Sequence, residues 1–179
     1  MMTSSETIFH MFPSSFFFFL SAVMSFTVTG FFALANGRQE VITSSSNKQT
    51  TYCTYDSSFS CSDFTSCPIL IRHFSPQHTL VSDQTIVFMI AKAGFPTTIT
   101  NAIVFQALYF FPVPGLPSSE DYENSAPEML HPVASIIGHV TTPLSPSTDL
   151  PRRFTMLTSS YISTGNVIST VTCVSISPT

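Results

Sequence analysis

The sequence predicts a mainly β protein whose folded domain lies in the C-terminal half of the chain. Runs rich in β-branched and aromatic residues recur from about residue 84 onward. Stretches that contain Pro or Gly separate these runs, as turns and loops separate strands. Only 9% of the residues are charged, so Ser and Thr hydroxyls must form much of the surface. We therefore expect three parts: an apolar segment (1–35), a Ser/Thr-rich linker (36–83) and a β-rich domain (84–179).

The first part contains an apolar run without charged residues, Phe16–Ala35. As a helix it would rise about 30 Å, the thickness of the hydrocarbon core of a bilayer. The run predicts a signal peptide, cleaved after Ala33-Leu34-Ala35, or a membrane anchor, and hence a secreted or membrane-associated protein. Two features oppose a signal peptide: no Lys or Arg precedes the run, and its length exceeds the usual apolar core of about 7–15 residues. Two alternatives stay open, a buried helix of an intracellular protein and translated non-coding sequence, since pyrimidine-rich codons encode Phe and Ser.

The second part, 36–83, has no sustained helical or strand period. Its apolar surface is too small to offset the entropy of ordering, so we expect disorder apart from an isolated strand at 68–71. The residue types that bind zinc occur here, at Cys61, Cys67, His73 and His78. Paired ligands of zinc fingers lie about 2–4 residues apart, and this spacing differs, so we predict no metal site. With Cys53 and Cys173 the chain has four Cys, enough for two disulfides in three alternative pairings.

The first two strands of the predicted domain are Thr85–Ala91 and Ile103–Phe111, which are rich in β-branched and aromatic residues. The second alternates, with Phe105 and Tyr109 on the same face. A Pro-rich stretch from Pro112 to Pro117 must end this strand, because Pro has no N–H for the ladder. One helical turn with a Ser cap is expected at 118–123, in a long acidic loop.

Three further strands complete the predicted domain, at Ala134–Val140, Arg152–Tyr161 and Val167–Ile176. Gly138 interrupts the first of them and marks a bulge or a close approach of another backbone segment. Gly and Asn at 164–166 favour a turn between the last two strands. The fifth run ends three residues before the last residue of the sequence, so closure of a barrel stays open.

This order of strands and loops looks like a small five-stranded OB-like barrel. The landmarks are Tyr109–Tyr122 with its Pro-rich start, His131-Pro132, Ile136–Val140 and Arg152-Arg153-Phe154. On these residues, the segment from Thr85 to Ile176 resembles uncharacterised small OB-like β-barrel proteins of mushroom-forming fungi. The resemblance implies a binding fold and transfers no functional residue, because its landmarks have no chemical role.

The sequence shows none of the patterns that mark an active site. No nucleophile elbow, His-Glu-x-x-His pair, phosphate-binding loop or dinucleotide fingerprint occurs, so we expect no catalytic residue and no cofactor. A net charge of −4 disfavours binding to duplex nucleic acid.

The function that we expect is a non-catalytic binding module whose ligand the sequence does not identify. Weak binding of single-stranded nucleic acid, through aromatic and basic side chains, is the candidate that we consider first. The candidate ligand-binding residues are Lys92, Phe105, Tyr109, Arg152, Arg153 and Phe154. One alternative is a secreted or membrane-anchored protein that acts through protein partners, with Phe16–Ala35 contacting the membrane. Another is a truncated or mis-annotated gene product without a function of its own.

Overall fold

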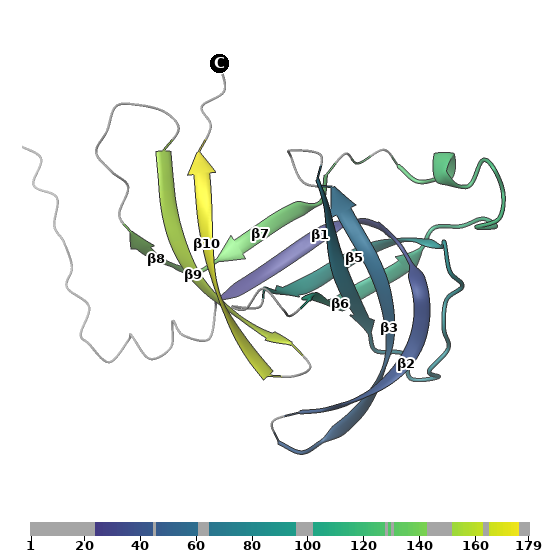
Figure 1. The fold of residues 1–179 in the computed structure, drawn as a ribbon, viewed down its shortest axis with the longest axis horizontal. Helices are drawn as coiled ribbons and strands as arrows, with labels where there is room; N and C mark the ends of the chain where they lie inside the picture. The colour runs from purple at the N-terminus through teal and green to yellow at the C-terminus, as the bar shows by residue number, and fades with distance from the viewer. Residues whose placement is uncertain are drawn as a thin grey trace, which may run out of the picture.

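The computed structural model describes residues 24–44, 46–60, 65–95, 102–127, 129, 131–142, 152–162 and 165–175. The described chain is mainly β, as predicted, and its strands form two sheets that lie side by side (Figure 1). In this part of the chain the regular helical structure is a single short 3-10 turn at Glu123–Ser125, just after the predicted helical turn.

The larger sheet has seven strands in the order β2-β3-β4-β6-β5-β1-β7. Its strands are β1 (Ser25–Ala33), β2 (Ala35–Thr43), β3 (Gln49–Ser60), β4 (Ser66–His73), β5 (Ile86–Gly94), β6 (Ile103–Pro112) and β7 (Val133–Ile137). The pair β4–β6 is parallel and the other pairs are antiparallel. Strand β6 ends at Pro112, as expected for a residue without an N–H.

A bend at Leu34 divides one segment into β1 and β2, and these two strands lie far apart in the strand order of the sheet. Strand β1 pairs with β5, whereas β2 pairs with β3. The Leu34 N–H donates to the carbonyl oxygen of Thr85 at 3.0 Å, and the Leu34 carbonyl accepts from the N–H of Gln84 at 2.7 Å. Beyond the bend, Asn36 has φ +52° and the register with β3 shifts before Arg38. One bent segment therefore connects the two ends of the run β2-β3-β4-β6-β5-β1.

The smaller sheet consists of β8 (His139–Thr142), β9 (Arg152–Ile162) and β10 (Gly165–Ser175), in the order β10-β9-β8. Hydroxyl groups attach it to the larger sheet. Ser160 Oγ accepts from the Phe26 N–H at 3.0 Å, and Ser169 Oγ donates to the carbonyl oxygen of Phe95 at 3.3 Å. The Ile162 side chain packs against Gly94, so the β9–β10 hairpin covers this end of the larger sheet.

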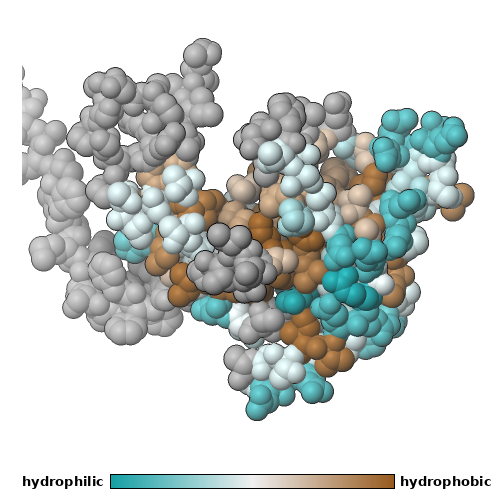
Figure 2. Space-filling model, viewed as in Figure 1, coloured by the Kyte–Doolittle hydropathy of each residue, from teal (hydrophilic) through white to brown (hydrophobic). Residues whose placement is uncertain are grey.

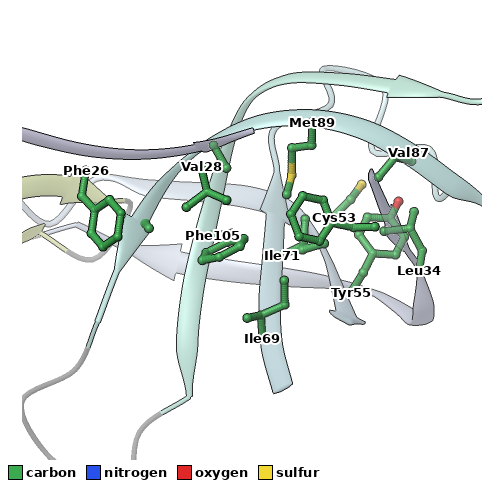
Figure 3. Packing of buried hydrophobic residues seen from close by; sticks show 13 residues of the cluster. Phe26, Val28, Leu34, Cys53, Tyr55, Ile69, Ile71, Val87, Met89 and Phe105 are labelled. Atoms are coloured by element: carbon green, nitrogen blue, oxygen red, sulfur yellow. The ribbon is translucent and has the colours of Figure 1, made fainter. Parts of the chain in front are cut away.

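The core lies inside the curved larger sheet, where side chains from β1, β3, β4, β5 and β6 point toward one another (Figure 3). On β1 the burial pattern alternates, so Phe26, Val28 and Phe32 face the core and the intervening Thr residues face outward. The Phe32 ring meets Phe105 edge to face at a centroid distance of 5.7 Å. The segment that was expected to be an apolar helix therefore supplies a large share of the core.

Two expectations about the N-terminal half are wrong. Residues 25–33, part of the predicted helix Phe16–Ala35, form strand β1, and residues 16–23 lie outside the described residues. Strands β2, β3 and β4 occupy most of the predicted disordered linker, 36–83. Order arises there because the inward residues of β3 and β4 join the core contributed by β1 and β5.

The five strands predicted in the C-terminal half exist, but they do not form one five-stranded barrel by themselves. Strands β5, β6 and β7 belong to the larger sheet, while β8, β9 and β10 form the smaller one. The third predicted strand is divided into β7 and β8 at Gly138. The close approach predicted at Gly138 is confirmed, because a Cβ there would clash with the carbonyl oxygen of Leu157.

Within the described ranges, no helix is long and apolar enough to cross a membrane. Cleavage after Ala33-Leu34-Ala35 would remove β1 and its contribution to the core.

We predict that a chain beginning at Asn36 does not fold, whereas a chain beginning at Met24 does. The shorter chain lacks four buried side chains, those of Phe26, Val28, Phe32 and Leu34. Each contributes about 1.5–3 kcal/mol by burial, so their loss is comparable with the whole stability of a domain, about 5–15 kcal/mol. Circular dichroism and thermal unfolding of the two chains check this. A cooperative transition in the chain that starts at Asn36 would contradict it.

Candidate functional site

The outward face of β2, β3 and β4 gathers aromatic, charged and hydrogen-bonding side chains. Inward Cys53 and Tyr55 on β3 are completely buried in the core, so Tyr52 and Thr54 project to the other side. We call this surface the Tyr52 face. It consists of Arg38, Glu40, Tyr52, Thr54, Arg72 and Phe74, which the register of β2–β3–β4 places in neighbouring positions.

An ion-pair network occupies one side of the Tyr52 face. Arg38 Nε lies 3.0 Å from Glu40 Oε1, and Arg38 Nη1 lies 3.0 Å from Asp56 Oδ1. Thr54, although outward-facing, is fully buried beneath this network and donates its hydroxyl to Glu40 Oε2 at 3.2 Å. Burial lowers the pKa of Arg38, but hydrogen bonds with Asp56 and Glu40 outweigh it, so the net shift is upward. The Arg38 charge is therefore neutralised within the face.

Aromatic rings occupy the other side of the Tyr52 face. The Tyr52 ring meets Phe74 edge to face at a centroid distance of 6.1 Å, and the Phe74 side chain is half exposed. Burial raises the pKa of Tyr52, and the Tyr161 phenol on β9 adds to the rise. Tyr161 is also half exposed. Two rings, one from β3 and one from the residue after β4, thus lie together on this face.

Arg72 is the second cation of the Tyr52 face. It lies on β4, opposite Thr54 on β3 and opposite Gln106 on β6. Burial lowers the pKa of Arg72, while Glu40 and Tyr52 act in the opposite direction and favour the charged form. A guanidinium group therefore lies beside the Tyr52 ring and within the field of Glu40, where it contributes positive charge next to an aromatic surface.

A second outward surface lies on β1, β5 and β6. The register aligns Phe31 with Phe88 and Phe88 with Phe111, and Ile90 with Tyr109. Tyr109 and Phe111 stack at a centroid distance of 6.3 Å, and both are more than half exposed. We call this surface the Phe88 face. In the space-filling view of Figure 2, hydrophobic residues reach the surface mainly in the middle, and hydrophilic residues gather toward the right.

The predicted ligand-binding residues do not form one site. Phe105 is completely buried between Phe32 and Phe59, so its ring is closed to a ligand. Tyr109 belongs to the Phe88 face, and Lys92 lies on the same outward side of β5, opposite Gln106.

The other three predicted residues lie on β9 in the smaller sheet, where Phe154 is partly buried. Arg152 and Arg153 pair with Ser175 and Val174 through their backbones, and their side chains lie outside the described part of the structure.

The sequence analysis missed Tyr52, Arg72 and Phe74, because they fall in the segment that was expected to be disordered. The alternation of Tyr52, Thr54 and Asp56 with Cys53 and Tyr55 was the signal that could have identified a strand with two different faces.

A hollow of about 580 Å³ lies beside the bend at Leu34. Tyr122 lines this hollow and is deeply buried. The Tyr122 hydroxyl donates to the Val113 carbonyl and accepts from the Ile86 N–H. The hydroxyl therefore holds the loop after β6 rather than a ligand. In the described ranges no three His, Cys, Asp or Glu residues are grouped to hold a metal ion, and Cys61 of the predicted zinc-type set lies outside those ranges.

No family model matches this chain, and no curated protein matches it. Among solved structures it is similar to a deletion mutant of the single-stranded DNA binding protein from Thermus aquaticus, with 9% identity and a TM-score of 0.41. The match covers 84% of this chain and 76% of that one. A TM-score this low does not establish a shared fold, so nothing about this chain follows from it. The resemblance to small fungal proteins stays a prediction.

His73, at the end of β4, makes the stability of the fold depend on pH. Its ring stacks on Phe110 at a centroid distance of 4.2 Å, and burial lowers its pKa. In the unfolded chain this histidine has its ordinary pKa of about 6.5. In the folded chain its pKa is lower, so the folded chain binds the proton less readily. As the pH falls below that value, the unfolded state binds more protons and the free energy of unfolding must decrease.

We therefore predict that wild type loses more stability than His73→Phe between about pH 7.5 and about pH 5.5. Phe keeps a ring against Phe110 and removes the titration. Urea unfolding at several pH values measures both chains. Hydrogen bonds from Asn36 and Arg38 lower the pKa of Asp56, so this group changes the free energy of unfolding only at more acidic pH. It therefore does not affect the comparison between about pH 7.5 and about pH 5.5. Parallel pH profiles of the two chains would refute this role of His73.

Proposed function

We propose that this chain is a non-catalytic OB-like module that binds single-stranded nucleic acid on the Tyr52 face. The strand order supports the OB-like interpretation. If β1 and β2 are counted as one bent first strand, then β3, β4, β5 and β6 are the second, third, fourth and fifth strands. The order in the sheet is then first-second-third-fifth-fourth-first, and the third and fifth strands are parallel. This is the arrangement of a five-stranded Greek-key barrel that closes through its first strand, and OB folds bind oligonucleotides on the face of strands two and three.

The observation that carries the ligand proposal is the composition of that same face. Strands two and three correspond to β3 and β4, which bear Tyr52, Arg72 and, just after β4, Phe74. Unpaired bases stack on aromatic rings regardless of sequence, and a guanidinium group contacts the phosphates. The face therefore combines stacking surfaces with a cation.

The charges of the Tyr52 face favour binding by stacking over binding by phosphate neutralisation. Glu40 and Asp56 pair with Arg38, so the charge of this cation is balanced within the protein, and the other cation near the rings is the half-buried Arg72. Each phosphate that a protein neutralises on a single strand contributes about −0.7 to the slope of log affinity against log salt. Because two carboxylates, Glu40 and Asp56, surround Arg38, we expect a shallow slope and a weak overall affinity.

We predict that Tyr52→Ala and Phe74→Ala each weaken binding of a labelled single-stranded oligonucleotide by about 5- to 150-fold, the equivalent of losing one stacked base at about 1–3 kcal/mol. Fluorescence anisotropy at low salt measures the affinity. Phe111→Ala is the matched control, because it removes a similarly exposed ring from the Phe88 face. No binding by wild type, or an equal loss in the Phe111 variant, would overturn the proposal.

A second substitution is expected to improve binding, which no loss of folding can imitate. Glu40→Gln removes the carboxylate that neutralises Arg38 and lies near Arg72, while its amide oxygen can still accept from Arg38 and its amide NH2 can donate to the Thr54 hydroxyl. We predict binding tighter by about 1.5- to 5-fold, as expected for a partly exposed ion pair of about 0.2–1 kcal/mol. Glu123→Gln, which removes the same charge at the 3-10 turn, is the control. Unchanged affinity in the Glu40 variant would place the nucleic acid elsewhere.

A further inference from the structure

The free edges of the two sheets differ in how they are protected from pairing with another strand. An edge presents unpaired N–H and C=O groups, and proteins shield such edges with charges, bulges or short strands. Strand β2 carries Arg38 and Glu40 and has a register shift, β7 has five residues, and β8 has four residues with its own register shift. These three edges are shielded.

Strand β10 has none of these protections. It has eleven residues, contains no charged residue and no Pro, and pairs with β9 without a register shift from Gly165 to Ser175. Among the described strands, β9 is its sole neighbour in the sheet, so about every second residue directs its backbone groups away from the sheet. Ile168 on this strand is 56% exposed.

The β10 edge is also held rigid by contacts on its other face. Ser169 is buried and donates to the Phe95 carbonyl, and Val171 packs against the core. An edge that is already ordered loses little further conformational entropy when a strand is added to it. The edge is therefore preorganised for pairing.

We propose that β10 pairs antiparallel with β10 of a second copy of this chain. Antiparallel pairing of identical strands about a two-fold axis requires an edge that is compatible with itself. The Val, Ile and Thr residues of β10 meet this requirement, since β-branched residues pair favourably across strands and no like charges oppose each other. An uncharged edge also offers no charge by which a foreign strand could be selected. The pairing would join the two smaller sheets into one continuous sheet and is independent of the nucleic acid.

Light scattering of the full chain tests this interface. Wild type should have twice the mass of the 19.6 kDa chain, and Ile168→Lys, which places a charge on the edge, should have the mass of one chain. Val140→Lys is the matched control, because it adds the same charge to β8, the opposite edge of the same sheet. Circular dichroism shows whether each variant keeps its β structure.

Hydrogen exchange on wild type gives a test that needs no variant. Amide protection in Gly165–Ser175 should increase with protein concentration, while protection in β8 should not. A single-chain mass for wild type, an Ile168 variant that stays dimeric, or a dimer without protection of β10 would each overturn the interface. If Ile168→Lys fails to fold, the exchange data decide alone. A wild-type chain that stays monomeric would leave this edge to a strand from another protein.

Discussion

The bend at Leu34 is the constraint on which the larger sheet depends. A strand can pair with two distant partners if its two halves point in different directions, and here β1 reaches β5 while β2 reaches β3. Leu34 exchanges two backbone hydrogen bonds with the chain at 84–85, and its own side chain is buried. Ser57 Oγ donates to the carbonyl of Ala33 at 2.7 Å, so strand β3, which pairs with β2, also bonds the last residue of β1. The corner is therefore tied to β5 and β3 at once, and the core forms around it.

In this chain, hydroxyl groups connect separate elements of the fold, as charged side chains do in many other proteins. The sequence indicated that Ser and Thr would cover a surface with few charges, but several of these residues instead join separate elements. Ser160 and Ser169 connect the smaller sheet to the ends of β1 and β5, and Thr158 donates to the Ile137 carbonyl where β7 gives way to β8. Each of these hydroxyls satisfies a backbone group that a strand neighbour leaves unpaired. The two sheets are thus joined by neutral hydrogen bonds, which salt does not screen.

The positions of the C-terminal strands could be predicted from the sequence because their runs are bounded by Pro and Gly. Pro112 ends β6, and Gly138 divides β7 from β8. Strand β1 was hidden by the absence of charge. Its polar side chains, Ser25, Thr27 and Thr29, dilute an apolar helix as readily as they mark the outer face of a strand.

The site could not be predicted for a related reason. Outward Tyr52 and Arg72 become neighbours only through the register of β3 with β4, which depends on tertiary pairing. Phe105 illustrates the converse, since periodicity placed it correctly in a strand but did not reveal which face would be buried. Sequence periodicity defines a face, and the fold decides whether that face meets the core or the solvent.

Strand β9 connects the β10 edge to the larger sheet. Its backbone supports β10 along eleven residues. Strand β9 in turn is fixed to the larger sheet through Ser160 and Ile162. A second copy paired along β10 would therefore hold its own Tyr52 face in a fixed relation to the first. Two weak faces held in this way gain from effective concentration, since the second contact becomes intramolecular. If both the proposed dimer and the proposed nucleic-acid site exist, this effect would strengthen binding by a face that has little net charge and relies on stacking.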